Sequence, residues 1–343
     1  MKRWAWAFLP LCLMAPPALS DPPEVGPSEA WEHDALFDPE LLPVRRSEVD
    51  GGPPFDPGRA PFSLVVRDDP VPNDVFFVST LPGELLDLQL EASDGRTTLR
   101  FGAGRVVASS AEGWIWEAPS EPGLAALRLE REEPHQAISL NVFILHPIDR
   151  VRSGVLNGYR IGDYAGRPLR GDSVYLPPPG FIEVSAEDED ILVSPHFTVG
   201  QFLCKQPGQP KYLALSRYLI AKLERVLERV NAAGYPSESL HIMSGFRTPW
   251  YNLSIGNRTV YSRHLWGGAA DVFLDTDGDG FMDDLDGDGR STIADARVLY
   301  ELAEEVDRSS VPSTRPGGLG AYPRNSVRGP FVHVDARGRS ARW

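Results

Sequence analysis

Two histidines and one aspartate are the residues best suited to chemistry in this chain. His264 and Asp271 lie seven residues apart with a glycine pair between them. A tight turn at the glycines would let the imidazole and the carboxylate converge on one cation. A catalytic zinc usually takes three protein ligands and leaves a fourth position for water, so a third ligand must come from elsewhere. His333 is the candidate, and the alternative is that each histidine sits alone with satisfied hydrogen bonds.

Three sequence motifs follow one another in the C-terminal half. They read Ser-Gly-Phe-Arg-Thr-Pro-Trp-Tyr-Asn at 244–252, Ser-x-His-x-x-Gly-x-Ala-x-Asp at 262–271 and Phe-Val-His-Val-Asp at 331–335. This ordered set resembles the signatures of the zinc D-alanyl-D-alanine carboxypeptidases and murein endopeptidases, the LAS-type peptidoglycan metallopeptidases. The resemblance covers residues 190 to 343, and three motifs in order are far more specific than any one of them.

The resemblance implies a role for each matched position. His264, Asp271 and His333 would be zinc ligands, and Arg247 would hold a substrate carboxylate or carbonyl, with a structural ion pair as its alternative role. Zinc held there would lower the pKa of its bound water and polarise the scissile carbonyl of a peptidoglycan stem peptide. The sequence leaves open whether the reaction is that of a carboxypeptidase or an endopeptidase.

One departure from the family pattern concerns the acid or base. Many relatives carry a histidine two residues before the distal ligand, or a carboxylate three before it, where this chain has Phe331 and Pro330. The nearest carboxylate is Asp335, which a strand would point to the same side as His333. Asp335 is therefore expected to act as general base, with support of a ligand imidazole as its alternative role. Because the usual acid or base of the family is missing, a non-catalytic protein that binds the cell wall is the alternative function.

The N-terminus predicts export, and the net charge limits the expected partners. Residues 1–20 read as a secretory signal, with Lys2 and Arg3 before an apolar segment that is too short to span a membrane. Its removal takes the net charge from −14 to −16, with 32 basic residues against 48 acidic ones. Such an acidic chain should repel nucleic acid and anionic membranes. We expect an exported, periplasmic or extracellular protein in which Cys204 is the only remaining cysteine and is buried.

Composition and periodicity divide the mature chain into four parts. Residues 21–60 are rich in Pro, Gly, Asp and Glu and predict a flexible lead-in. Residues 61–147 contain short, turn-punctuated β runs, including Trp114 and Trp116 on one face, and predict an all-β immunoglobulin-like sandwich. Residues 148–190 predict a Gly- and Pro-rich linker. Residues 191–343 form the expected peptidase domain, an α+β fold with a small antiparallel sheet and flanking helices, including a helix from Tyr212 to Ala233.

An acidic insertion at 275–295 separates the second and third expected zinc ligands. Its aspartates recur at the spacing of calcium-binding loops, with glycines for the sharp turn. Two overlapping loops fit, and their expected calcium ligands are Asp275, Asp277, Asp279, Asp283 and Asp286 in the first, and Asp284, Asp286, Asp288 and Asp295 in the second. Asp286 would either bridge two calcium ions, or only one of the two loops would hold an ion. The alternatives are a solvated acidic turn, or a calcium-dependent structural protein without zinc.

Overall fold

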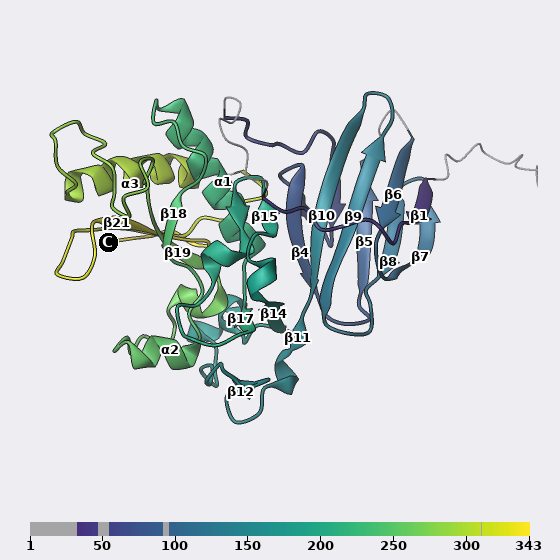
Figure 1. Cartoon of the computed structure of the whole chain (residues 1–343), viewed down its shortest axis with the longest axis horizontal. Helices are drawn as coiled ribbons and strands as arrows, with labels where there is room; N and C mark the ends of the chain where they lie inside the picture. Colours follow the sequence, from purple (N-terminus) through teal and green to yellow (C-terminus); the bar gives the residue numbers. More distant parts are fainter. Residues whose placement is uncertain (1–32, 47–54, 92–95, 310) are drawn as a thin grey trace, which may run out of the picture. The chain divides into compact units, whose positions relative to one another are not determined.

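The computed structural model describes residues 33–46, 55–91, 96–309 and 311–343 (Figure 1). All of them belong to one compact unit, residues 31–343, which is rich in strands and has few helices. The predicted signal at 1–20 lies outside the described residues. Among those described, no helix has both the length and the apolar character that crossing a bilayer requires.

Two five-stranded sheets lie in the N-terminal part of the described chain. The first has the order β1 (Asp34–Phe37), β6 (Thr97–Phe101), β9 (Gly123–Arg131), β10 (Gln136–Ile144) and β4 (Val75–Thr80). The second has the order β3 (Asp69–Pro70), β2 (Leu64–Val66), β5 (Leu85–Leu90), β8 (Gly113–Glu117) and β7 (Arg105–Ser110). Neighbouring strands are antiparallel except for β1 with β6 and β4 with β10, which are parallel.

Alternation of apolar and polar residues explains which faces of these sheets are buried. In β5 every second side chain is buried, as a strand with one solvated face requires. Trp114 and Trp116 are both buried, so the expected core packing of the two indoles is confirmed. Asp34–Phe37 lies inside the expected flexible lead-in, yet it forms β1 because the edge of β6 supplies backbone partners.

Short strands and 3-10 turns occupy residues 146–213. The strands are β11 (His146–Pro147), β12 (Val155–Leu156), β13 (Tyr159–Arg160), β14 (Gly180–Val184), β15 (Leu192–Ser194), β16 (Phe197–Thr198) and β17 (Lys211–Leu213). The 3-10 helices are η1 (Ile148–Arg150), η2 (Leu169–Gly171), η3 (Ser173–Tyr175), η4 (Ala186–Asp188) and η5 (Val199–Phe202). The expected linker at 148–190 thus contains β14, whose Phe181 is fully buried.

The C-terminal sheet has five strands and carries the expected site. Its order is β18 (His241–Ser244), β19 (Ala269–Phe273), β21 (Phe331–Asp335), β20 (Gly318–Tyr322) and β22 (Ala341–Arg342), antiparallel except for β20 with β22. Every residue of β19 and β21 is buried, because both faces of these central strands are covered. The expected strand at 331–335 is confirmed.

Three α-helices complete this part: α1 (Arg217–Ala232), α2 (Pro249–Ser254) and α3 (Ile293–Arg308). Helices α1 and α3 contact each other, and α3 also contacts β20 and β21. The helix predicted from Tyr212 begins five residues too early, because Tyr212 is in β17 and pairs with β14. Its predicted end is close to correct, since Gly234 follows the last turn with φ +93°.

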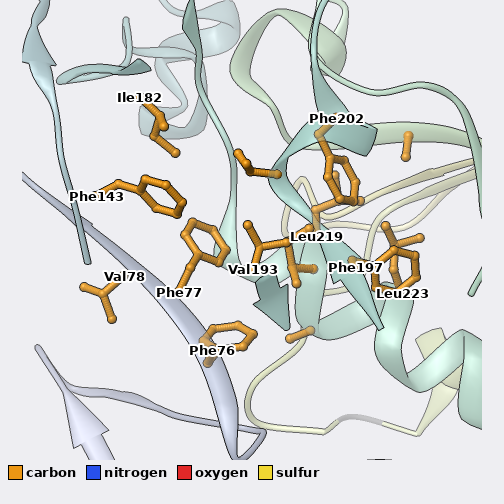
Figure 2. Close-up of a cluster of buried hydrophobic side chains, with 14 of the residues drawn as sticks. Phe76, Phe77, Val78, Phe143, Ile182, Val193, Phe197, Phe202, Leu219 and Leu223 are labelled. Carbon is orange, nitrogen blue, oxygen red and sulfur yellow. The ribbon is translucent and has the colours of Figure 1, made fainter. Parts of the chain in front are cut away.

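A continuous apolar cluster connects strands and helix (Figure 2). Phe76 and Phe77 of β4 are essentially buried, as are Val193 of β15 and Leu219 and Leu223 of α1. Burial of large apolar side chains contributes about 1.5–3 kcal/mol each relative to full exposure. The strands of the first sheet and helix α1 therefore share one hydrophobic core.

Candidate metal centre

Strand pairing places two of the three expected zinc ligands next to each other. β19 and β21 pair antiparallel, and their register puts Asp271 opposite His333. The Nδ1 atom of His333 lies 2.9 Å from Oδ1 of Asp271. Residues 62 positions apart in the sequence are thus joined by one of the two inner strand pairs of this sheet.

A glycine turn brings the third residue to the same point. His264 lies in η6 (Arg263–Trp266), and Gly267 ends this turn in the left-handed conformation at φ +59°. A Cβ at Gly267 would collide with the carbonyl of Ala214, so glycine is required both by conformation and by space. The chain therefore reverses directly into β19, and Nε2 of His264 lies 3.3 Å from Oδ1 of Asp271.

The ligand atoms of His264, Asp271 and His333 all lie within 4.8 Å of one another, and all three side chains are buried. Nδ1 of His264 lies 2.7 Å from the carbonyl oxygen of Gly245, to which it donates. That hydrogen bond leaves the lone pair of Nε2 directed toward Asp271. Two imidazoles and one carboxylate with this orientation form a donor set that suits zinc.

Asp335 binds the far side of the His333 ring. Its Oδ2 lies 3.3 Å from Nε2 of His333, on the nitrogen opposite the one that faces Asp271. The carboxylate also accepts from the backbone N–H of Gly318 at 2.8 Å and forms an ion pair with Arg337. The carboxylate is fully buried and its acceptors are engaged, so the geometry favours the alternative, supporting role over the expected role of general base.

Burial and charge shift the pKa values of these groups in different directions. Burial lowers the pKa of His264, which keeps its imidazole neutral. Burial alone would raise the pKa of Asp271, but the adjoining His264 and His333 outweigh it and hold the pKa well below its usual value. Burial likewise opposes protonation of His333, but hydrogen bonds to Asp271 and Asp335 raise its pKa. The hydrogen bonds of His333 and Arg337 lower the pKa of Asp335 against its burial.

Arg247 lies at the edge of the same group. Its Nη2 donates to Oδ2 of Asp271 at 2.6 Å and its Nε to Oγ of Ser244 at 2.8 Å. Its backbone N–H donates to the carbonyl of His264 at 3.1 Å. The structure thus shows an ion pair that orients Asp271, which was the alternative role for this arginine, and its contact with substrate stays a prediction.

Sequence reasoning missed three contributors to this site. Arg337 and Gly318 fix Asp335, and the ring of Trp343 lies 5.3 Å from that of His333. The position of Arg337, two residues after Asp335, was a signal for a same-side contact. The other two depend on how β20 and β22 pair, which the local sequence does not reveal.

The acidic insertion forms two separate groups. Asp275, Asp277 and Asp279 make one, and Asp284, Asp286 and Asp295 make the other. The structure does not bring the expected ligands Asp283 and Asp288 into either group, and Asp286 belongs only to the second. The Asp283 carboxylate instead accepts hydrogen bonds from Thr276.

A further histidine, His196, hydrogen-bonds through Nδ1 to Glu224 at 2.7 Å. Its ring also stacks on Phe55 with centroids 4.8 Å apart. The contacts of this histidine are therefore those of a structural residue.

No protein-family model matches the chain, and no curated protein matches it at a significant level. Any function must therefore be argued from the geometry of the site and from the motif resemblance.

Proposed function

We propose that the protein is an exported zinc-dependent peptidase that hydrolyses peptidoglycan stem peptides or crosslinks. The observation that carries this proposal is the convergence of His264, Asp271 and His333 within 4.8 Å, from three separate elements. The three ordered motifs support it, because the residues that converge are those that the resemblance assigns as ligands. Carboxypeptidase and endopeptidase activity both fit this site.

The residues of the chain fit a zinc ion. Bound zinc would supply a water of lowered pKa and polarise the scissile carbonyl. His264 would offer Nε2 and His333 would offer Nδ1, because their other nitrogens are committed to Gly245 and Asp335. Asp335 holds the His333 ring in one orientation, and Arg247 holds the Asp271 carboxylate. These outer contacts keep the three donors aimed at one point.

The proposal also assigns a role to the rest of the chain. In this proposal residues 191–343 are the α+β peptidase domain, and residues 61–147 are an immunoglobulin-like accessory domain that positions cell-wall substrate. The two N-terminal five-stranded sheets and the mostly antiparallel C-terminal sheet with its helices support this division. The net charge disfavours nucleic acid as a partner.

A second candidate is a non-catalytic protein that retains the peptidase fold and binds the cell wall. The engagement of Asp335 by Arg337 and Gly318 favours it, because this carboxylate was the nearest replacement for the acid or base. Among the described residues, the group of metal-type ligands at this site also has only the three members named above. Cleavage would separate the two candidates.

The decisive experiment incubates the zinc-loaded mature protein with muropeptides and analyses the products by mass spectrometry. The peptidase proposal expects released D-alanine or a cut crosslink, and the loss of both in His264→Ala. His135 lies exposed in the turn between β9 and β10, so His135→Ala is the matched control and should keep full activity. Binding of muropeptides without any product would support the second candidate, and absence of stoichiometric zinc would contradict the peptidase.

A further inference from the structure

The first acidic loop begins directly after the strand that carries Asp271. β19 ends at Phe273, and Asp275 follows two residues later. One carboxylate oxygen each from Asp275, Asp277 and Asp279 lies within 4.8 Å of the others. The loop borders a surface pocket of about 440 Å³ that is also lined by Tyr235 and Met282.

Asp275 has a buried oxygen that lacks a partner. Its side chain is only 7% exposed, and Oδ2 accepts from the backbone N–H of Gly280 at 3.1 Å. Oδ1 is buried with no hydrogen-bond partner among the described residues. An ionised carboxylate oxygen without water or a donor is costly, so such an atom in a folded protein calls for a ligand.

The neighbouring charges make a cation the appropriate ligand. Three carboxylates at this separation repel one another. Within the described part of the chain, no lysine or arginine forms an ion pair with Asp275, Asp277 or Asp279, and His241 meets Asp275 only at Oδ2, 3.5 Å away. A water molecule would satisfy the orphan oxygen but would leave the repulsion, whereas a divalent cation removes both penalties.

We propose that Asp275, Asp277 and Asp279 bind one hard divalent cation of the calcium class. Oxygen-only ligands from a flexible loop suit calcium, because magnesium demands near-ideal octahedral geometry and gives up its water reluctantly. This site is distinct from the zinc site, which has two imidazole ligands. It goes beyond the proposed peptidase activity and stands without it.

The second acidic group carries no such proposal, although the sequence predicts calcium there as well. The Asp295 carboxylate accepts from the backbone N–H groups of Leu285, Asp286 and Thr292, at 2.6 to 3.1 Å. Asp284 accepts from three further backbone N–H groups, those of Gly287, Asp288 and Gly289. No carboxylate oxygen of this group is both buried and without a partner among the described residues.

Cation binding in the first loop should affect the edge of the zinc site. The N–H of Asp283 donates to the carbonyl of Leu274 at 2.9 Å, which anchors the loop to the end of β19. His241, which meets Asp275, stacks on Phe273 with ring centroids 4.3 Å apart and starts β18. β18 ends at Ser244, whose hydroxyl accepts from Arg247. An ion that fixes the loop therefore also fixes the ends of two strands that lead to the metal centre.

Calcium binding can be measured on the mature chain by equilibrium dialysis in calcium-free buffer to which Ca²⁺ alone is added. We expect one Ca²⁺ per chain with Kd between about 10⁻⁶ and 10⁻³ M, and a higher unfolding temperature in 5 mM Ca²⁺ than in 5 mM Mg²⁺. Asp277→Asn and Asp279→Asn change exposed side chains, so the variants should fold, and each should weaken binding at least tenfold.

Asp288→Asn is the matched control, because it changes an equally exposed aspartate outside both groups and should bind Ca²⁺ as the original protein does. A chain that binds no Ca²⁺ at 10 mM would overturn the proposal. Binding that survives Asp277→Asn but is lost in Asp286→Asn would also overturn it, because the ion would then occupy the second group. Repeating the titration in His264→Ala separates the two metals, since this site should bind Ca²⁺ whether or not the zinc proposal holds.

Discussion

The two metal-type clusters of this protein are built in contrasting ways. At His264, Asp271 and His333 the groups lie on a central strand pair and a glycine turn, and the outward atom of each imidazole has a protein partner. At Asp275, Asp277 and Asp279 the groups lie on a loop, and no lysine or arginine of the described residues forms an ion pair with them. The first cluster is held in place before any ion arrives, whereas the second depends on an ion for its charge balance.

The largest effect is expected from removing one of the two imidazoles of the first cluster. His264→Ala or His333→Ala leaves two ligands, so zinc affinity and hydrolysis should each fall by more than about 100-fold, since changes to outer contacts alone cost 10–100-fold. Zinc content after dialysis and muropeptide turnover measure this effect. Retention of one zinc per chain in either variant would contradict the assignment of the ligands.

A change at Lys222 measures how much the buried charges behind the first cluster contribute to the free energy of unfolding. Its Nζ is fully buried, pairs with Asp307 and donates to the backbone carbonyl of Asp335 at 2.8 Å. Lys222→Met should lower the free energy of unfolding by about 3–5 kcal/mol, because it leaves Asp307 buried with one partner fewer. The exposed pair Arg229–Glu305 gives the control, and Arg229→Met should cost less than about 1 kcal/mol by urea unfolding.

Asp335→Asn distinguishes a supporting carboxylate from a general base. The amide still reaches His333 but loses the charge that fixes its ring, so zinc affinity should fall by about 10–100-fold. Saturating zinc should restore most of the turnover if the carboxylate only positions the ring. A variant that binds zinc normally yet stays inactive at every zinc concentration would show that Asp335 takes the proton.

The smallest expected effect lies at the start of α3, beside the second acidic group. The Thr292 hydroxyl accepts from the N–H of Ala294 at 3.0 Å, and Asp295 accepts from the N–H of Thr292, which together form a capping box. Thr292→Ala should lower the free energy of unfolding by about 1 kcal/mol and leave zinc content unchanged. A change in zinc content would mean that α3 and the metal centre are coupled more tightly than their separate contacts indicate.

The sequence predicted the residues of the main site better than their surroundings. Residue type and spacing singled out His264, Asp271 and His333, because metal ligands come from a short list of side chains and the glycine turn is a local feature. The contact of Asp335 with Gly318 was not predictable, since Gly318 reaches the carboxylate only through the pairing of β20 with β21. The contact with Arg337 had a local signal that was missed. Residue alternation alone placed Asp335 on the side of His333 and left its role undecided.

Regions without a local signal were predicted less well. Asp34–Phe37 lies in a segment whose overall composition predicts flexibility, but an available strand edge gives it backbone hydrogen bonds. The start of α1 was placed too early because the apolar residues of β17 continue the helical spacing. In both cases distant pairing outweighed local preference.

The pairing of Asp271 with His333 encloses the whole acidic segment and helix α3 between two neighbouring strands. The three expected ligands cannot come together until residues 331–335 have been synthesised and have paired with β19. We therefore expect metal affinity to appear only late in folding. The entropic cost of bringing the two ends of such a connection together rises by only about 0.6 kcal/mol for each doubling of the number of residues between them. Within this stretch, the exposed residues 323–328 between β20 and β21 are therefore the position at which the scaffold can gain sequence at little cost to the metal centre.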